Sequence, residues 1–438
     1  MSEKMLNENE VLLQTEVAED IKEENTSEAN NNDVILKVEN LCQYFKLGRS
    51  TLKAVNNVNF EIKRGEVFGL VGESGCGKTT TGRSIIKLYD CTSGNVYFDG
   101  RRICAGTKVY KDTKKAAFKE MIDKIKNRKR SEEPVDIKEE INKYKAIAKE
   151  ENAKIKSAKF DHKKCDKVYA LEHVAAVKAE YMPKLEAMDK ESEEYKALNK
   201  EFRKELRLAR RERIVTKIQM IFQDPIASLD PRMTVREIIA EGLIIKGVKD
   251  KKVIEEKVYE VLEKVGLVRE HANRYPHEFS GGQRQRIGVA RSIIMQPELI
   301  IADEPVSALD VSIQAQVINL LNELRHELGI TILFVAHDLS VVKYFSDRIA
   351  VMYYGNMVEL ASSEELFKNP LHPYTKSLLS AIPLPDPVYE KKRTRIVYNP
   401  LADHDYSAQG PTFREVAPGH FVSCNDEEMK KYQEILNK

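Results

Sequence analysis

Residues 72–79 read GESGCGKT, and this stretch decides the fold of the chain. It fits the pattern G-x-x-x-x-G-K-[ST], in which a glycine-rich loop holds phosphate groups with its backbone N–H groups. Residues 66–71 (EVFGLV) are apolar enough for a short buried strand, and residues 80–88 (TTGRSIIKL) have the pattern of an amphipathic helix. A glycine-rich turn between a strand and a helix predicts a phosphate site at the N-terminus of that helix.

Two side chains of this loop are predicted to bind the nucleotide and its metal ion. Lys78 can bridge the β- and γ-phosphates, and the hydroxyl of Thr79 can bind Mg²⁺. Cys76 is interpreted as a small residue that fits the loop. Because a helix N-terminus can lower the pKa of a thiol, alkylation of Cys76 is the alternative, incidental to the chemistry of the loop. The predicted nucleotide contacts are Gly72, Glu73, Ser74, Gly75, Cys76, Gly77, Lys78, Thr79 and Thr80.

The bulk properties narrow the class of protein. The chain has 438 residues, room for two or three domains, and its formal net charge is only +2, which argues against a protein dedicated to nucleic acid. No apolar run approaches the roughly 20 residues that span a bilayer, and the acidic N-terminus is not that of a signal peptide. The six cysteines form no C-x-x-C pair and no metal-ligand spacing, which indicates isolated thiols in a reducing compartment.

The composition divides the chain into segments. Residues 1–33 are acidic and rich in Asn, and we expect a mobile tail. Short runs rich in β-branched residues begin at Val34 and predict strands. Ahead of the phosphate loop, the ring of Phe45, or alternatively that of Tyr44, could stack on an adenine base, although such a pair is also typical of a core.

A charged segment at 106–213 interrupts this pattern. Lys, Glu, Ala and Arg dominate it, and apolar residues recur at steps of three and four, as in 137, 141, 144 and 148 and again in 171, 174, 181, 185, 188, 195, 198 and 202. We predict an antiparallel, coiled-coil-like helical hairpin that projects from the body, with breaks at Pro134 and Pro183. A solvated, partly disordered insert is the alternative. Nucleic-acid binding is disfavoured because Lys and Glu alternate.

Four polar positions follow apolar runs beyond this segment. Residues 299–302 predict a buried strand that ends in Asp303 and Glu304, and residues 331–336 predict another that ends at His337. Asp303 would hold Mg²⁺ and Glu304 would be the general base for an attacking water, oriented by His337. Gln223, after its own strand, is expected to contact Mg²⁺ and the water. The predicted catalytic residues are therefore Glu304, His337, Gln223 and Lys78, and the predicted metal ligands are Thr79, Gln223 and Asp303.

Together these motifs resemble an ATP-binding cassette (ABC) ATPase. The resemblance covers residues 34 to about 360 without the insert, and it includes the signature Ser-Gly-Gly-Gln at 280–283 and Ser-Ala-Leu-Asp at 307–310. It implies an α/β fold: a P-loop core sheet, an antiparallel β subdomain and a helical signature subdomain. It also implies that ATP and Mg²⁺ bind at an interface between two cassettes. The further nucleotide contacts that it implies are Ser280, Gly281, Gly282, Gln283 and Asp310.

A finer resemblance, to the oligopeptide/dipeptide importer branch, rests on residues 222–235, 370–383 and 411–424. It implies an ATPase domain at 34–364 and a C-terminal extension at 365–438, which we expect to pack over the domain. It also implies a homologous ATPase subunit, two transmembrane permease subunits, an extracytoplasmic peptide-binding protein, and a peripheral location on the cytoplasmic face of the membrane. No direct contact with transported substrate or nucleic acid is expected. Cys424 stands alone in the extension, so no iron–sulfur centre is predicted.

Other classes fit the motifs less well. A coiled-coil ABC ATPase of DNA maintenance has its coiled coil after the glutamine motif, whereas Gln223 follows the insert here. A translation factor of the superfamily carries two cassettes, whereas one phosphate loop and one signature are present. Within the importer branch, the sequence leaves open which peptides are carried, and whether the cargo is a related one such as nickel.

Overall fold

The computed structural model describes residues 33–127, 136–382 and 395–436, so the tail expected at 1–33 lies outside the described residues except for Asp33. The centre of the fold is an eight-stranded sheet in the order β11-β12-β10-β9-β3-β8-β7-β6. Its parallel part comprises β9 (Arg348–Tyr353), β3 (Val67–Val71), β8 (Thr331–Ala336), β7 (Leu299–Asp303) and β6 (Ile218–Ile221). Every residue of β3, β7 and β8 is buried, as expected for parallel strands covered on both faces.

At their carboxyl ends, the parallel strands β3, β7 and β8 each lead through a loop into a helix. The phosphate loop connects β3 to α2 (Lys78–Ile85), which begins two residues earlier than the sequence predicts. The helix ends before Lys87, whose φ of 62° is left-handed and cannot continue it. The helices α10 (Val311–Leu328) and α11 (Leu339–Phe345) follow β7 and β8 in the same way.

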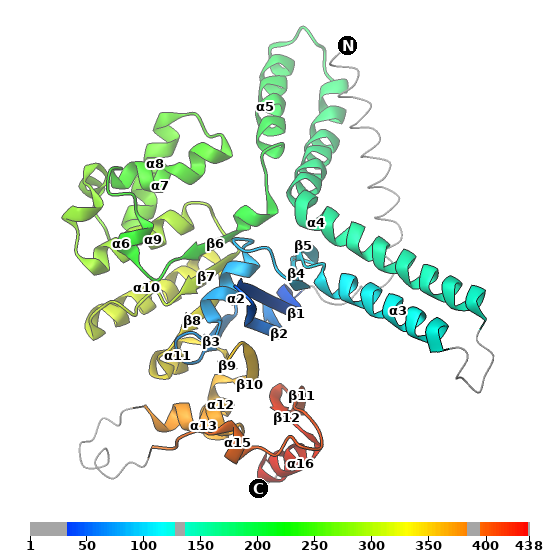
Figure 1. The fold of residues 1–438 in the computed structure, drawn as a ribbon. Coiled ribbons are helices and arrows are strands. Elements are labelled where there is room, and N and C mark those ends of the chain that lie inside the picture. The colour runs from blue at the N-terminus through cyan, green and yellow to red at the C-terminus, as the bar shows by residue number, and fades with distance from the viewer. Residues whose placement is uncertain (1–32, 128–135, 383–394, 437–438) are drawn as a thin grey trace.

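An antiparallel sheet of four strands lies beside α2 (Figure 1). Its order is β2-β1-β4-β5, formed by β1 (Val34–Leu47), β2 (Ser50–Lys63), β4 (Ser93–Phe98) and β5 (Arg101–Ala105). The inward-facing apolar residues of this sheet pack with one face of the central sheet in a common core, which includes Phe60 and Phe68 as stacked rings. The two sheets therefore hold the phosphate loop between them.

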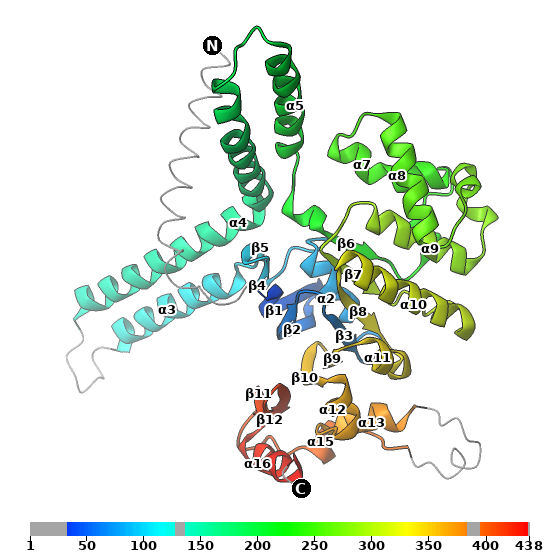
Figure 2. The ribbon, with the colours of Figure 1, turned by 180° about the vertical axis from the view of Figure 1, so that it is seen from behind.

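The helical subdomain lies beyond the β6 side of the central sheet (Figures 1 and 2), and it shares a hydrophobic core with that sheet, which includes Ile239, Ile287 and Ile300. It comprises α6 (Pro225–Ser228), α7 (Val235–Lys246), α8 (Lys251–Lys264) and α9 (Gly281–Ile293), with 3₁₀ turns at Arg269–Asn273 and Pro276–Glu278. The helical stretch predicted from about 234 to 272 is broken at Gly247, whose φ of 94° caps α7. Thr234 begins α7 with a capping box, and Ser280 begins α9 with another, shared with Gln283.

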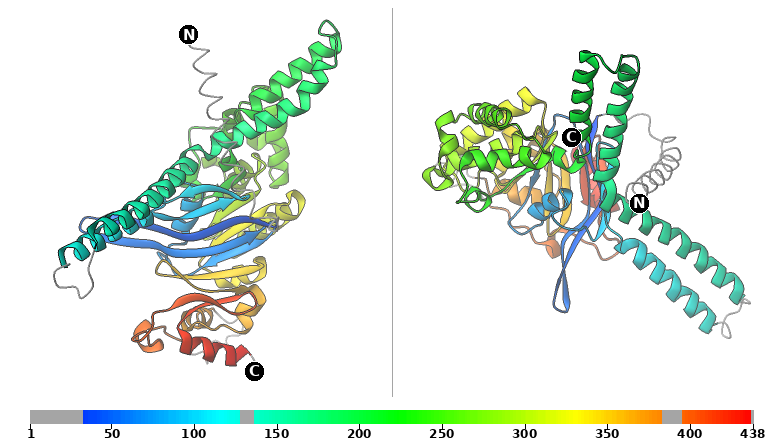
Figure 3. Two further views of the ribbon diagram at one scale, coloured as in Figure 1. Left: turned by 90° about the vertical axis from the view of Figure 1, so that its right-hand side faces the viewer. Right: turned by 90° about the horizontal axis from the view of Figure 1, so that it is seen from above.

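In the described parts of the segment, residues 106–127 and 136–213, the chain forms three helices: α3 (Lys108–Asn127), α4 (Ile137–Glu186) and α5 (Glu193–Ala209). Figure 3 shows that α4 is one long helix, with α3 beside its N-terminal part and α5 beside its C-terminal part. The segment therefore has two antiparallel arms that point in different directions, where the sequence predicts one hairpin. A pair of rings packs within each arm. Phe118, which lies outside the predicted apolar stripe, packs on Tyr144 with centroids 5.3 Å apart, and Tyr181 packs on Phe202, both within the stripe, at 5.7 Å.

The prediction of a break at Pro183 is wrong by a few residues. Pro183 lies inside α4, whose last residue is Glu186, and the chain turns only between 187 and 192. Pro134, the other predicted break, lies outside the described residues. The middle of α4 is fastened to the body: Arg102 of β5 donates to Asp161 at 2.7 Å, and Tyr169 packs against the core under the antiparallel sheet.

The C-terminal extension continues the central sheet. Its strand β12 (His420–Cys424) pairs antiparallel with β10 (Asn356–Ser362), and β11 (Thr412–Ala417) pairs with β12 as the edge strand. The helices α12 (Ser363–Lys368), α13 (Pro373–Ser380), α15 (Pro400–Asp403) and α16 (Asp426–Leu436) surround this end. The extension therefore adds strands to the sheet, whereas the sequence predicts only a segment that packs over the domain.

The expectations on membrane spans and cysteines can be compared with the fold. No helix within residues 33–127, 136–382 and 395–436 has the length and apolarity to cross a membrane. The six cysteines are free, but Cys91 and Cys104 are not isolated, because their buried Sγ atoms lie 2.9 Å apart. The described residues contain no cluster of three or more His, Cys, Asp or Glu side chains that could hold a metal ion.

Candidate functional site

The phosphate loop has a backbone that its glycines make possible. Gly72, Gly75 and Gly77 have φ angles of 149°, 82° and 109°, a region that L-residues with side chains rarely adopt. A Cβ atom on Gly72 would lie 2.2 Å from the carbonyl oxygen of Met352, and one on Gly77 would lie 2.2 Å from that of Ala54. The loop is therefore packed closely between β9 and β2.

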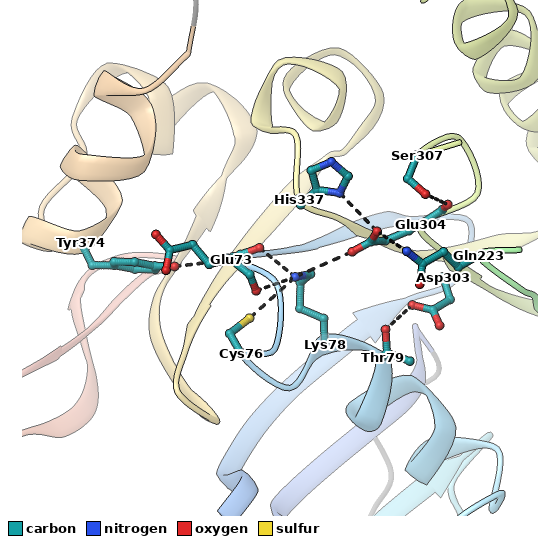
Figure 4. Close-up of polar contacts among 11 residues, drawn as sticks. Glu73, Cys76, Lys78, Thr79, Gln223, Asp303, Glu304, Ser307, His337 and Tyr374 are labelled. Atoms are coloured by element: carbon teal, nitrogen blue, oxygen red, sulfur yellow. Dashed lines mark hydrogen bonds and ion pairs between the residues drawn. The ribbon is translucent and has the colours of Figure 1, made fainter. Parts of the chain in front are cut away.

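Lys78 is buried at the centre of this loop, with 4% of its surface exposed. Its ammonium donates to the carbonyl oxygens of Gly72 at 2.7 Å and Glu73 at 3.0 Å (Figure 4). The nearest carboxylate oxygen is Oε1 of Glu304, at 4.0 Å. A buried ammonium at the N-terminus of a helix is a strong site for anionic groups such as phosphates.

Burial changes the expectation for Cys76. Its thiol is 6% exposed, and burial raises its pKa, although the nearby Lys78 acts in the opposite direction. Burial therefore favours the interpretation of Cys76 as a small residue that fits the loop and disfavours the alternative of alkylation, because the effect of desolvation on the pKa exceeds that of the ammonium. Ser74 is exposed in the loop and Thr80 is half-buried in α2.

Asp303, at the end of β7, is fully buried beside the start of α2. Its Oδ1 accepts a hydrogen bond from the hydroxyl of Thr79 at 2.7 Å. Its Oδ2 is buried and has no hydrogen-bond partner among the described residues. Burial raises the pKa of this carboxyl group above its usual value, against the opposing effects of Thr79 and Arg83. A buried polar atom without a partner is costly and is typical of a binding position.

The neighbouring Glu304 is where three other predicted residues meet. Gln223 Nε2 donates to its Oε2 at 2.9 Å, and Nδ1 of His337 lies 3.2 Å from the same oxygen, while Lys78 faces the other oxygen (Figure 4). Glu304 itself is 9% exposed and has a φ of 45°, which is unusual for a residue with a side chain. Such strain is typical of functional positions, because the surrounding structure must maintain it.

These contacts arise because three parallel strands end at one edge of the sheet. Glu304 follows β7, His337 follows β8, and Gln223 follows β6, which pairs with β7. The oxygens of Thr79, Asp303 and Gln223 are hard ligands of the kind that Mg²⁺ prefers, and the unpartnered Oδ2 of Asp303 fits this use. The cluster can therefore hold a phosphate chain with its metal ion and supply a base beside it.

The other predicted nucleotide contacts lie elsewhere in the chain. No hydrogen bond or ion pair joins the described residues 280–283 to the phosphate loop. Ser280 and Gly281 are exposed at the N-terminus of α9, and Gly282 and Gln283 are half-buried there. The side chain of Asp310 is exposed at the start of α10 and makes no capping bond.

The two candidate adenine platforms make different contacts. Phe45 is half-buried, and its ring meets Tyr89 edge-on at 5.4 Å between centroids. The hydroxyl of Tyr44 donates to Asn56 at 2.6 Å, and the ammonium of Lys108 lies 4.9 Å from its ring centroid. Phe45 thus stays the predicted platform, since the face of Tyr44 is already occupied by a cation.

One contact to the phosphate loop comes from a residue to which the sequence assigns no role. The backbone N–H of Glu73 donates to the hydroxyl of Tyr374, in α13 of the C-terminal extension, at 3.1 Å. The two residues are separated by 301 positions. The only local signal of Tyr374 is its place within residues 370–383, which carry a family resemblance and no chemistry of their own.

Known proteins resemble this chain over most of its length. The family described as "ABC transporter" matches residues 55–175 and 183–307, and that described as "Oligopeptide/dipeptide transporter, C-terminal region" matches residues 358–416. The chain is 46% identical over 399 residues to the oligopeptide transport ATP-binding protein OppF of Bacillus subtilis (strain 168), a match of 91% of this chain and 98% of that protein.

Two further relatives are also transport ATP-binding proteins. The oligopeptide transport ATP-binding protein AmiF of Streptococcus pneumoniae serotype 4 is 41% identical over 407 residues, which is 93% of this chain and all of that protein. The dipeptide transport ATP-binding protein DppF of Lactococcus lactis subsp. cremoris (strain MG1363) is 40% identical over 403 residues, 91% of this chain and 96% of that protein. All three names concern transport, and none concerns DNA maintenance.

Proposed function

The chain belongs to the ABC transporter family, among the oligopeptide/dipeptide transport ATP-binding proteins, and we propose from this that it hydrolyses ATP to energise the import of peptides. The observation that supports its enzymatic part best is the contact set of Glu304. One buried carboxylate lies within 4.0 Å of Lys78, 2.9 Å of Gln223 and 3.2 Å of His337. Each of these residues was predicted separately from a motif, and a common meeting point is what a hydrolytic site requires.

The proposed division of labour follows from the positions of these groups. The phosphate loop and Lys78 hold the β- and γ-phosphates with N–H and ammonium donors. Glu304 takes the proton from the water whose oxygen forms a bond to the γ-phosphorus, while the bond from that phosphorus to the bridging oxygen breaks and ADP leaves. His337 and Gln223 both contact Oε2 of Glu304, so they fix the orientation of the base and leave Oε1 toward Lys78.

Mg²⁺ is the proposed metal ion of this site. Thr79, Asp303 and Gln223 would hold it, since they place a hydroxyl, a carboxylate and an amide close to the start of α2. When bound, the ion would neutralise the negative charge of the phosphates. The buried Oδ2 of Asp303, which has no hydrogen-bond partner among the described residues, supports this assignment.

The signature residues are proposed to act on a second nucleotide. Ser280, Gly281, Gly282 and Gln283 begin α9 on the side of the helical subdomain, and Asp310 begins α10 nearby. Because they are not joined to this chain's own phosphate loop, we propose that they contact the phosphates bound by a homologous ATPase subunit, with Phe45 under the adenine of this chain's own nucleotide. The two subunits would then close around ATP and separate after hydrolysis.

The remaining partners are proposed from the relatives, whose names describe transport ATP-binding proteins. The chain would lie on the cytoplasmic face of the membrane against two permease subunits, with a peptide-binding protein on the other side. It would contact neither the peptide nor nucleic acid.

Identification of the proteins that co-purify with this chain tests the proposal. A tagged Glu304→Gln chain, which should bind ATP and hydrolyse it slowly, is expressed in its native cell, solubilised with ATP present and purified. We expect two membrane-spanning permeases and a second ATP-binding subunit to co-purify. Recovery of a homodimer with DNA or ribosomes, and without permeases, would contradict the transport role.

A further inference from the structure

Tyr374 connects the C-terminal extension to the phosphate loop. Its hydroxyl accepts the hydrogen bond from the backbone N–H of Glu73 at 3.1 Å, as Figure 4 shows. The carbonyl oxygen of the same residue accepts the bond from Lys78 at 3.0 Å. Glu73 is thus held at both of its backbone polar groups, on one side by the extension and on the other by the lysine of the loop.

The ring of Tyr374 is rigidly placed. It is 2% exposed, and its centroid lies 4.4 Å from that of Tyr353 and 5.5 Å from that of Tyr398. Tyr353 ends β9, and two residues later Gly355 donates its N–H to the carbonyl of Cys76 at 2.9 Å. The aromatic cluster and the turn after β9 therefore anchor the loop at two residues, Glu73 and Cys76.

The start of α13, which carries Tyr374, is fixed by a buried carboxylate. Glu359 of β10 is fully buried and accepts the backbone N–H groups of Leu371 at 2.8 Å and His372 at 3.0 Å. Nε2 of His420, in β12, lies 2.8 Å from the same carboxylate. A continuous set of bonded and packed groups thus runs from the added strand β12 through Glu359 to Tyr374 and the loop.

We propose that Tyr374 is a positioning residue for nucleotide binding: its hydroxyl holds Glu73 so that the phosphate loop is formed before the phosphates arrive. This inference rests on the proposed function, since it concerns how the same loop binds ATP. Ordering a loop in advance reduces the entropy that binding must offset. The extension, which carries none of the predicted nucleotide contacts, thereby sets the affinity of the site.

Tyr374→Phe isolates the hydroxyl, because it keeps the buried ring. Tyr398→Phe is the matched control: its ring belongs to the same cluster, but its hydroxyl makes no hydrogen bond within the described residues. Lys78→Ala is the reference for loss of the site. For each full-length chain, three quantities are measured: the Kd for ATP by titration calorimetry, the melting temperature, and amide hydrogen exchange resolved at Glu73 and Ser74.

Loss of one hydrogen bond predicts that the Kd for ATP of Tyr374→Phe is roughly 3–10-fold higher than that of the unmodified chain. The melting temperature should be like that of Tyr398→Phe. Exchange at Glu73 should become faster in Tyr374→Phe only. In the unmodified chain it should be slower than at Ser74, whose N–H makes no hydrogen bond within the part of the chain that the structure describes. A general structural defect would instead lower the melting temperature and spread the exchange beyond the loop, which would overturn the proposal.

The outcomes separate the inference from the function on which it rests. If Lys78→Ala abolishes ATP binding while Tyr374→Phe and Tyr398→Phe bind equally well, the positioning role is wrong and the ATP site stands. If the unmodified chain itself exchanges Glu73 as fast as Ser74, the hydrogen bond does not persist in solution and the inference is overturned. If Lys78→Ala binds ATP as tightly as the unmodified chain, both the site and the inference are contradicted.

Discussion

The hydroxyl of Thr79 donates to Oδ1 of Asp303 at 2.7 Å, and this bond joins the first turn of α2 to the end of β7. The second oxygen of the same carboxylate is buried without a partner among the described residues. One side chain thus has one satisfied atom and one atom whose burial is costly, and the proposed Mg²⁺ would offset that cost. A binding role would explain why a carboxylate that is unfavourable for stability is buried at the end of β7.

Asp303→Asn should therefore separate stability from activity. Burial raises the pKa of Asp303, so the ionised form at neutral pH costs stability, and the cost disappears as pH falls through the raised pKa. In metal-free buffer the variant should melt at the same or a higher temperature at pH 7, and the difference should shrink toward pH 4. Its Mg²⁺-dependent ATPase rate should fall by about 10²-fold or more. Full Mg²⁺ stimulation in the variant would contradict the metal role.

Glu304→Gln should leave ATP binding intact and slow hydrolysis. Loss of a general base costs roughly 10²–10⁴-fold in rate. Glu298→Gln is the matched control, because Glu298 precedes the same strand at its other end, where it pairs with Arg64 and Lys217 at the surface. Single-turnover hydrolysis of radiolabelled ATP measures both. Similar rates for the two variants would remove Glu304 from its role.

The stability of the extension should depend on the protonation of His372. Burial, aided by the charges of His404 and Lys376, lowers the pKa of His372 to about 3. The folded chain keeps this ring neutral while the unfolded chain takes up a proton near pH 6.5, so stability is present above pH 6.5 and is lost as pH falls below it. Between pH 7 and pH 5 the loss from this group is about 2 kcal/mol.

The variant His372→Asn tests this directly, because Asn can keep the helix cap that the ring nitrogen provides to Tyr374 and does not titrate. The difference in unfolding free energy between the two chains, measured by urea unfolding at pH 5, 6 and 7, should change in favour of the variant as pH falls. A difference that is constant over this range would show that His372 is not held neutral.

The middle of α4, which contacts the antiparallel sheet, should contribute to the stability of the folded domain. The two arms that α4 forms with α3 and α5 should contribute little. Asp161 contacts the guanidinium of Arg102, which also donates to Ser157 at 2.6 Å. Asp161→Ala leaves a part-buried cation without its partner and should lower the unfolding free energy by about 1–3 kcal/mol. Glu150→Ala, on the same helix but exposed and paired with Lys154, should change it by less than about 0.5 kcal/mol. Equal thermal shifts for the two variants would contradict the anchoring of α4.

The motif residues of the site could be predicted because each follows a strand whose apolar pattern is clear. Parallel strands end at one edge of a sheet, so the sequence positions of Gln223, Glu304 and His337 also predict their proximity. Their distances to one another, and the left-handed φ of Glu304, depend on the packing of the whole sheet and could not be read from any local pattern.

Other features have no local signal at all. The hydrogen bond from Glu73 to Tyr374 joins residues 301 positions apart, and the pairing of β12 with β10 depends on a partner strand distant in the sequence. The two arms of α4 show a related limit: apolar steps of three and four predict helices and a buried stripe, but not which helix covers which part of it. Burial likewise determined the pKa of Cys76, which the helix N-terminus alone predicts with the wrong sign.

The most direct test of the central claim is peptide uptake in the native cell. A radiolabelled tripeptide is supplied to cells whose only copy of this chain carries Lys78→Ala, with Lys111→Ala, an exposed lysine of α3, as the control and uptake of a free amino acid as the reference. The account predicts that tripeptide uptake falls to background in Lys78→Ala alone, while amino-acid uptake is unchanged. Tripeptide uptake at the unmodified rate in Lys78→Ala would contradict the proposal that this chain energises peptide import.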